Sequence, residues 1–145
     1  MPYLVDTNVL SETLKPRPDP SVTAWFASQS PGDLFLSAIS LGELVRGAYR
    51  MKEKSNRERL ARWVEDDLTA QFQDRILPFD QGASMIWGKI MGDGDKTGRP
   101  RSMADAQIAA VAKRYGFILV TRNTKDFKDM NVTLVNPWAL PSGSP

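Results

Sequence analysis

Three acidic residues stand where a strand ends or a helix begins. Asp6 directly follows an apolar strand at 3–5, and Glu43 and Asp105 lie early in two predicted helices. The sequence has no His and no Cys, which excludes thiolate catalysis, Ser-His triads and the usual Cys/His zinc sites. Any acid–base chemistry must therefore use carboxylates, Lys, Tyr or metal-bound water.

Carboxylates from separate elements that meet at one place would suit Mg²⁺ or Mn²⁺. These ions prefer hard oxygen ligands, and water and phosphate oxygens often complete their octahedral coordination. Without a cation, mutual repulsion would raise the pKa of at least one acid. If Asp6, Glu43 and Asp105 converge in the fold, a divalent-metal site is expected there.

Helix capping is the alternative explanation for two of these acids. The segments "SLGE" and "SMAD" match a capping box or its Asp variant, with Ser40 and Ser102 as N-caps. Acids in a first turn also complement the helix dipole. Capping therefore explains Glu43 and Asp105 about as well as catalysis does.

Asp6 fits the capping explanation less well. It ends an apolar strand, and Asn8 or Ser11 could cap the helix that follows. Its position therefore favours a role in chemistry.

Alternating strand-like and helix-like segments predict an α/β fold. Strands are expected at 2–5, 34–37, 75–79, 117–121 and 132–136. Helices are expected at 6–15, 22–29, 41–52, 56–72, 82–91 and 103–115, with Gly116 as the C-cap of the last and a polar loop at 92–101. This order predicts a three-layer α/β/α domain at 1–138, on a mainly parallel sheet of four to five strands, and a flexible tail at 139–145. Ligands of such sheets bind at the carboxyl ends of the strands.

Charge is unevenly distributed along a chain of 145 residues with net charge +2. The segment 46–62 has seven basic and two acidic residues. Such a stripe is compatible with nucleic acid, with an acidic partner, or with a solvated helix pair. No signal peptide and no apolar run of roughly 18 residues is present, so a cytoplasmic protein without a membrane segment is expected.

The segment "VTRNTKDF" adds polar residues after the strongest predicted strand. Thr121 can bind a phosphate or a water, and Asn123 offers a neutral oxygen. Asp126 is either a further acid of the site or a solvated turn residue.

Four segments together resemble the PIN-domain ribonucleases, most closely the VapC and FitB toxins of bacterial toxin–antitoxin pairs. They are "VDTNVLSE" (5–12), "AISLGELVRG" (38–47), "ADAQIAAVAKRYG" (104–116) and "LVTRNTKDF" (119–127). Each motif alone is weak, but the four occur in order, and the resemblance covers residues 2 to about 138.

The resemblance implies that Asp6, Glu43 and Asp105 bind Mg²⁺ or Mn²⁺ and that the reaction is hydrolysis of an RNA phosphodiester. Thr7 and Thr121 match the hydroxyl positions of the family. Asn8 matches the Asn that orients the first Asp.

The family often has a fourth acid where this sequence has Asn123. This departure puts a second metal site in question, and Asp126 is a candidate substitute.

The resemblance also implies an RNA substrate, a cognate antitoxin and a homodimer or toxin–antitoxin hetero-oligomer. Arg99, Arg101, Arg122 and Lys125 are candidate phosphate contacts, with solvated loop residues as the alternative. The predicted interface includes residues from the aromatic set Trp25, Phe26, Tyr49, Trp63 and Trp87, with core packing as the alternative.

Two other functions remain open from the sequence. A haloacid-dehalogenase-like phosphatase would use Asp6 as a nucleophile, but Asn8 stands where its general acid belongs. A catalytically weakened PIN-like RNA-binding module is favoured by Asn123.

Overall fold

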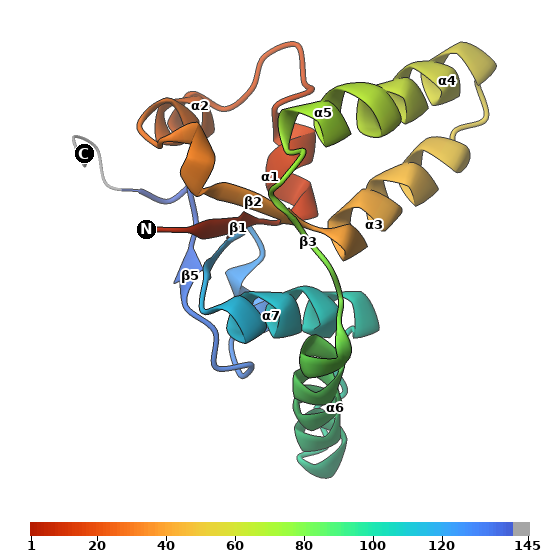
Figure 1. The fold of residues 1–145 in the computed structure, drawn as a ribbon. Coiled ribbons are helices and arrows are strands. Elements are labelled where there is room, and N and C mark those ends of the chain that lie inside the picture. The colour runs from red at the N-terminus through yellow and green to blue at the C-terminus, as the bar shows by residue number, and fades with distance from the viewer. Residues whose placement is uncertain (141–145) are drawn as a thin grey trace.

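The computed structural model describes residues 1–140 and is built on a five-stranded sheet in the order β3-β2-β1-β4-β5. The strands are β1 (Tyr3–Val5), β2 (Leu34–Ser37), β3 (Ile76–Leu77), β4 (Ile118–Val120) and β5 (Leu134–Val135). Every neighbouring pair is parallel. The predicted parallel α/β sheet is confirmed (Figure 1), and the carboxyl ends of β1, β2 and β4 share one edge because β1 pairs parallel with both neighbours.

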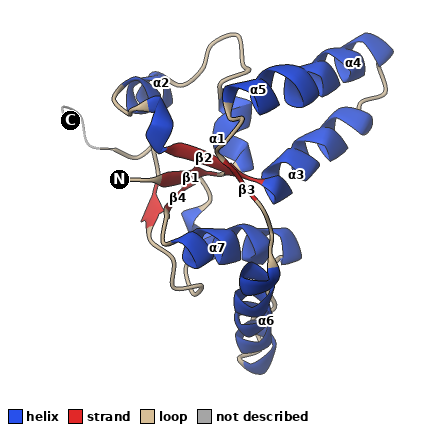
Figure 2. Cartoon of the chain, in the orientation of Figure 1, coloured by secondary structure: helices blue, strands red, loops and turns tan. Residues whose placement is uncertain are grey.

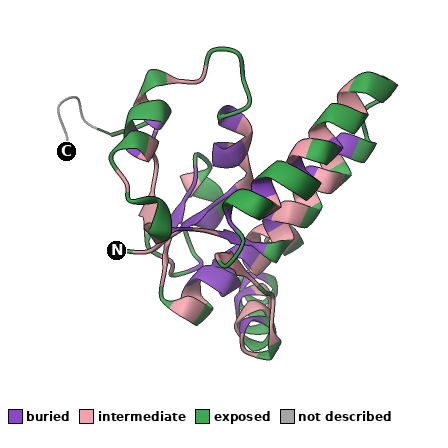
Figure 3. Cartoon of the chain, turned by 45° about the horizontal axis from the view of Figure 1, so that its top comes forward, coloured by how far each residue is buried: buried purple, intermediate pink, exposed green. Residues whose placement is uncertain are grey.

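Helices cover both faces of the sheet (Figure 2). They are α1 (Thr7–Glu12), α2 (Pro20–Ala27), α3 (Ala38–Tyr49), α4 (Lys54–Arg62), the π-helical segment η2 (Trp63–Leu68), α5 (Thr69–Gln71), α6 (Gln81–Lys96) and α7 (Met103–Tyr115), with 3-10 turns η1 (Pro31–Asp33) and η3 (Thr124–Phe127). Side chains of β1 alternate between the faces: Leu4 packs toward α6 and α7, and Val5 packs toward α1, α2 and α3. Buried residues accordingly concentrate in the sheet and on the helix faces beside it (Figure 3).

Helix α7 has the predicted bounds. Ser102 accepts the N–H of Asp105 at 3.3 Å, as an N-cap does. Gly116 ends the helix with φ 72°, a left-handed conformation that favours glycine. Small Ala side chains along the buried face let α7 lie close to the sheet.

Helix α3 begins earlier than predicted, which changes the interpretation of Glu43. Its N-cap is Ser37, whose Oγ accepts the N–H of Ser40 at 3.0 Å. The predicted cap at Ser40 is wrong because the helix starts directly where β2 ends. Glu43 therefore lies in the second turn, where the capping box does not account for it.

Helix α1 is capped by Asp6, and the predicted caps Asn8 and Ser11 are wrong. Asp6 has extended backbone angles, and its Oδ1 accepts the N–H of Thr7 at 2.8 Å. One carboxylate oxygen of Asp6 is therefore used for capping, although the sequence made Asp6 the acid least suited to that role.

Helix α6 extends to Lys96, so the predicted loop at 92–101 is wrong over its first half. Gly94 is buried, and a Cβ on it would lie 2.8 Å from the backbone oxygen of Arg99. The glycine therefore lets the chain after α6 pack against the helix.

None of the helices within residues 1–140 combines the length and apolar character that a membrane crossing requires. The boundary at 138 stays a prediction. Of the predicted tail at 139–145, positions 141–145 lie outside the described residues.

Candidate active site

The candidate site lies at the carboxyl edge of the sheet, where β1 and β4 are neighbours. The N–H of Asp6 donates to the carbonyl oxygen of Val120 at 2.9 Å, continuing the ladder between the strands. Beyond it, the hydroxyl of Thr121 donates to Asp6 Oδ2 at 2.8 Å. The two residues after these strands are therefore joined side chain to side chain.

Asp6 is a buried carboxylate with 5% of its surface exposed. Burial raises its pKa to about 6, against the lowering effect of the Thr121 and Thr7 hydrogen bonds. The charges of Asp105 and Glu43 raise the pKa further. The structure thus places the three predicted acids within electrostatic reach of one another.

Glu43 is held by a hydroxyl chain that begins at Thr7. Thr7 Oγ1 donates to Glu43 Oε1 at 2.8 Å and lies 3.0 Å from Ser40 Oγ. Ser40 and Ser37 are both fully buried, with their hydroxyl oxygens 3.4 Å apart. The sequence interpretation missed these two serines as part of the site, although the serines in "LSAIS" flank the point where the strand becomes a helix.

Asp105 faces the same region from the first turn of α7. Partial burial raises the pKa of its carboxyl, and the charges of Asp126 and Glu43 raise it further. Asp105 and Asp126 also line one polar hollow. Asp126 is therefore a neighbour of the acidic group, although its own side chain is exposed.

Asn8 reaches Asp6 through Thr121. Its Nδ2 lies 3.4 Å from Thr121 Oγ1, and its Oδ1 accepts the N–H of Arg122 at 3.4 Å. The N–H of Asn123 also donates to Thr121 Oγ1, at 3.1 Å. The buried hydroxyl of Thr121 thus accepts from two residues while it donates to Asp6.

The four candidate phosphate-binding cations differ in their surroundings. Arg99 and Lys125 are exposed and line a hollow of about 240 Å³ with Asp105 and Asp126. Arg101 also lines it but donates to the carbonyl oxygens of Ile90 and Asp129 at 2.7 and 2.9 Å.

Arg122 does not line that hollow, and its guanidinium lies 5.0 Å from the ring centroid of Trp138. Arg99 pairs with Asp129 Oδ2 at 3.3 Å, so Lys125 is the cation best placed to meet a phosphate near Asp105.

The acids of the site have no basic partner within residues 1–140. None of the ion pairs in this part of the chain includes Asp6, Glu43, Asp105 or Asp126. Their oxygens suit a hard divalent cation. No three acids among the described residues lie close enough to hold an ion by themselves. Water or phosphate oxygens would have to complete its coordination, as is usual for Mg²⁺.

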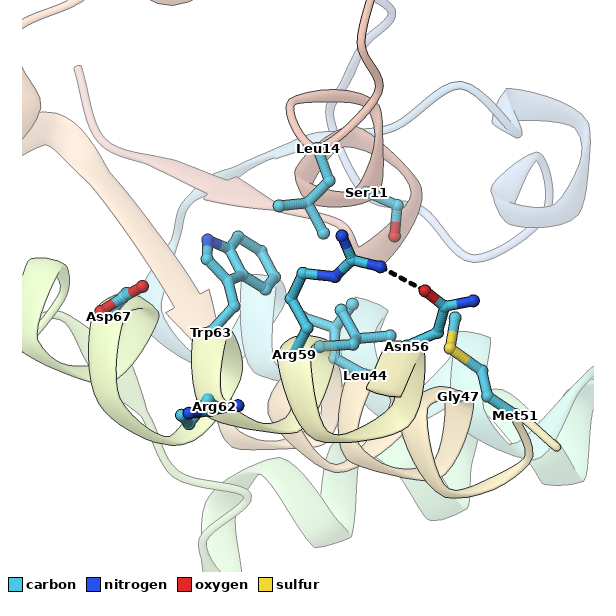
Figure 4. A pocket seen from close by; sticks show the side chains of 11 residues that line it. Ser11, Leu14, Leu44, Gly47, Met51, Asn56, Arg59, Arg62, Trp63 and Asp67 are labelled. Carbon is cyan, nitrogen blue, oxygen red and sulfur yellow. Dashed lines mark hydrogen bonds between the residues drawn. The ribbon is translucent and has the colours of Figure 1, made fainter. Parts of the chain in front are cut away.

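A groove of about 820 Å³ is lined by residues of α1, α3, α4 and η2. Its apolar walls include Leu14, Leu44 and Trp63, and it is also lined by Arg59 and Asn56, whose side chains are hydrogen-bonded to each other (Figure 4). Helices α1 and α3 also position Thr7 and Glu43. The groove therefore begins on the elements that hold the acidic site.

The aromatic residues considered as interface candidates have different environments. Trp25 is buried and packs edge-on against Tyr3, so core packing explains it. Tyr49 is 64% exposed, and Trp63 lines the groove. Trp87 donates its ring N–H to the carbonyl oxygen of Met103 at 3.3 Å, and Phe26 is partly buried.

The all-parallel sheet with helices on both faces defines an α/β protein, and Asp6, Glu43 and Asp105 lie after or near the carboxyl ends of its strands. The family model of the PIN domain matches residues 3–132, so the chain belongs to the PIN-domain family. This match confirms the predicted family and decides against the phosphatase alternative.

Similar proteins come from the toxin branch of that family. Toxin FitB of Neisseria gonorrhoeae is 36% identical, with 93% of this chain and 97% of FitB covered. The VapC ribonuclease Y4jK of Sinorhizobium fredii is 36% identical, with 93% and 96% covered. The crystal structure of FitAcB from Neisseria gonorrhoeae aligns with a TM-score of 0.87 at 36% identity, covering 95% of this chain and 99% of that one. The chain is therefore of the VapC/FitB type, as its motifs predicted.

Proposed function

We propose that this protein is a Mg²⁺- or Mn²⁺-dependent endoribonuclease that acts as the toxin of a toxin–antitoxin pair. The observation that carries the proposal is that Asp6, Glu43 and Asp105, from three separate elements, lie within electrostatic reach of one another and have no basic partner in residues 1–140. The family and the similarity to a VapC ribonuclease support RNA as the substrate.

In this mechanism Asp6, Glu43 and Asp105 would hold the cation. The chemistry that Mg²⁺ or Mn²⁺ would supply when bound is a water of lowered pKa and neutralisation of charge on the attacked phosphate. Thr121 and the N–H of Thr7 fix the two oxygens of Asp6, and the Thr7 hydroxyl fixes Glu43. Asn8 acts on Asp6 only indirectly, because its side chain contacts Thr121, which in turn contacts Asp6.

The nucleophile is water, so a 2′-hydroxyl is not required for the reaction. Selection of RNA would then depend on its shape and on unpaired bases. Lys125 is placed to contact phosphate beside Asp105, and Arg99 lines the same hollow while it pairs with Asp129. Arg101 and Arg122 are less available for this because of their contacts with backbone oxygens and with Trp138.

The proposed protein partners are a cognate antitoxin and a second copy of this chain. The groove between α1, α3 and α4 offers an antitoxin an apolar floor on the helices that also carry Thr7 and Glu43. A basic side chain of the antitoxin that reached Asp6, Glu43 and Asp105 would compete with the cation. Tyr49 and Trp63 are the aromatic residues best placed for contacts with a partner.

The test is cleavage of structured RNAs by the purified protein with Mg²⁺, Mn²⁺ or EDTA, using Asp6→Asn and Asp105→Asn. Asp74→Asn is the matched control, because Asp74 is exposed and belongs to none of the contacts of the site. Cleavage is expected with metal in the wild type and in Asp74→Asn, and its loss is expected in EDTA and in the two site variants. Cleavage that persists in EDTA contradicts the metal mechanism, and RNA binding without cleavage under any metal favours the weakened binding module.

A further inference from the structure

The hairpin formed by α3 and α4 concentrates positive charge. The two helices lie side by side and extend away from the sheet, with their connection at the far end (Figure 1). The segment Arg46–Arg62 has a surplus of five positive charges, while the whole chain has +2. The remainder of the protein is therefore net negative, and the hairpin is a basic arm on an otherwise acidic molecule.

The basic arm begins on the same helix face as Glu43. Arg46 and Arg50 follow Glu43 by three and seven residues, which places them on one face, about 4.5 and about 10.5 Å further along the axis. Gly47 lies on this face between them. On the opposite face of α3 the side chains of Leu44 and Ala48 are buried against the rest of the protein. The exposed face of α3 thus leads from an acid of the site to two arginines.

These arginines have no acidic partner in the described part of the chain. Both are exposed, and neither takes part in an ion pair within residues 1–140. Two cations of α4 are less available to bind an anion. Lys54 pairs with Glu58 at 3.9 Å, and Arg57 donates to the Met51 carbonyl oxygen at 3.3 Å. Arg46 and Arg50 are therefore free to bind an anion.

We propose that the face of α3 carrying Arg46 and Arg50 binds the phosphate backbone of the RNA strand whose cleaved bond lies at the acidic site. This inference rests on the proposed function. A strand with one phosphodiester beside Glu43 continues along α3, and each of its phosphates carries a negative charge that an exposed arginine can contact. The positive charges of Arg46 and Arg50 also offset the electrostatic repulsion between the RNA strand and the acids of the candidate site.

An acidic protein segment is the competing occupant of this face. The RNA backbone fits better because the positive charges are in line with Glu43, where the phosphodiester must lie, and because phosphates recur regularly along a strand. Binding of a protein would be expected to bury an apolar core. Most of the apolar surface nearby lies in the groove that Leu44 and Gly47 line, and the exposed Tyr49 stands beside Arg50 at the end of α3.

The test is RNA binding by the Arg46→Gln/Arg50→Gln variant, measured by fluorescence anisotropy of a labelled oligouridylate of ~20 nucleotides. EDTA keeps the strand intact, and the salt concentration is varied from about 50 to about 300 mM. The matched control is Lys89→Gln/Lys96→Gln, which removes two exposed cations from α6 on the other side of the sheet. Thermal melting checks that both variants fold.

Loss of two phosphate contacts should weaken binding about 5- to 10-fold at ~100 mM salt and make the slope of log K against log salt shallower by about 1.4. The control should stay within about twofold of the wild type, because only non-specific attraction changes. Equal affinity and slope in the two double variants overturns the proposal.

A second measurement separates this proposal from the proposed function. If the wild type cleaves RNA with metal but the arginine variant binds RNA normally, the inference about α3 is wrong and the nuclease function stands. If the wild type neither binds nor cleaves RNA, both are wrong. If the variant loses affinity for a labelled polyglutamate peptide but not for RNA, the face serves an acidic protein, which also overturns the proposal.

Discussion

The hydroxyl of Thr121 donates to the buried carboxylate of Asp6 at 2.8 Å, joining residues 115 positions apart in the sequence. The pairing of Val5 with Val120 in the parallel ladder brings them together. Thr121 also accepts from Asn8 and from the N–H of Asn123. The buried hydroxyl of Thr121 therefore connects Asp6 and Asn8, which follow β1, with Asn123, which follows β4.

Thr121→Val should impair both stability and catalysis. The change keeps the shape of the side chain but leaves Asp6 without a donor and two N–H groups without an acceptor, which costs about 1–3 kcal/mol of unfolding free energy. Thr121→Ser, which keeps the hydroxyl, is the control. Urea unfolding and the pH profile of RNA cleavage measure the two effects. A valine variant equal to the wild type in both would show that the hydroxyl has no role.

Asp6→Asn should make the metal-free protein more stable near neutral pH. Burial raises the pKa of Asp6 from 3.8 to about 6, so the native state favours the neutral acid. The stability contributed by the neutral form is fully present below 3.8 and is lost as pH rises through about 6, up to roughly 2–3 kcal/mol.

Urea unfolding in EDTA at several pH values tests this. The advantage of Asp6→Asn over the wild type should vanish toward about pH 4, and the exposed control Asp74→Asn should show no such trend. An advantage that is the same at every pH would contradict the burial explanation.

Mg²⁺ or Mn²⁺ should stabilise the wild type, because a cation relieves the repulsion among Asp6, Glu43 and Asp105. At a metal concentration ten times Kd the gain is about 1.4 kcal/mol, or a rise in Tm of roughly 3–6 °C. Scanning calorimetry with and without the ion measures it. Asp105→Asn should lose most of the gain, and a gain that is undiminished in this variant would place the ion elsewhere.

Asn123→Asp should strengthen metal binding, because it adds a carboxylate next to Thr121 at the position where the family often has one. Asp126→Asn should weaken it if Asp126 substitutes for the missing acid. Calorimetric titration with Mn²⁺ measures both without relying on activity. Unchanged affinity in Asp126→Asn would reduce Asp126 to a solvated turn residue.

Two glycines of α6 should respond to alanine in opposite directions. At Gly94 a Cβ would lie 2.8 Å from the Arg99 backbone oxygen, so Gly94→Ala should lower the unfolding free energy by about 1–2 kcal/mol. At Gly88 nothing lies within 4 Å, so Gly88→Ala should raise it by about 0.5–1 kcal/mol through helix propensity. Urea unfolding of the two variants measures both changes in unfolding free energy. A Gly94→Ala variant that is more stable than the wild type would show that the turn after α6 can move.

The sequence by itself determined the alternation of strands and helices and the bounds of α7, and it predicted that three acids could meet at one sheet edge. These features depend on local pattern: apolar runs, a Ser cap and a glycine after the last helical turn. Its motifs also indicated the family. The same local reasoning misjudged the helix caps, because each helix start offers more than one residue type that can cap it. Asp6, Asn8 and Ser11 are alternatives for α1, and Ser37 and Ser40 are alternatives for α3.

Tertiary structure decided which of these competing residues does what. Strand pairing fixes where each helix begins, so Asp6 is a helix cap as well as a candidate site residue, and Glu43 lies beyond the first turn of α3. Gly94 lies inside α6, and the chain after the helix packs against it. The Thr7–Glu43 and Thr121–Asp6 contacts join distant segments. Their geometry follows from the register of the sheet, which no local pattern specifies.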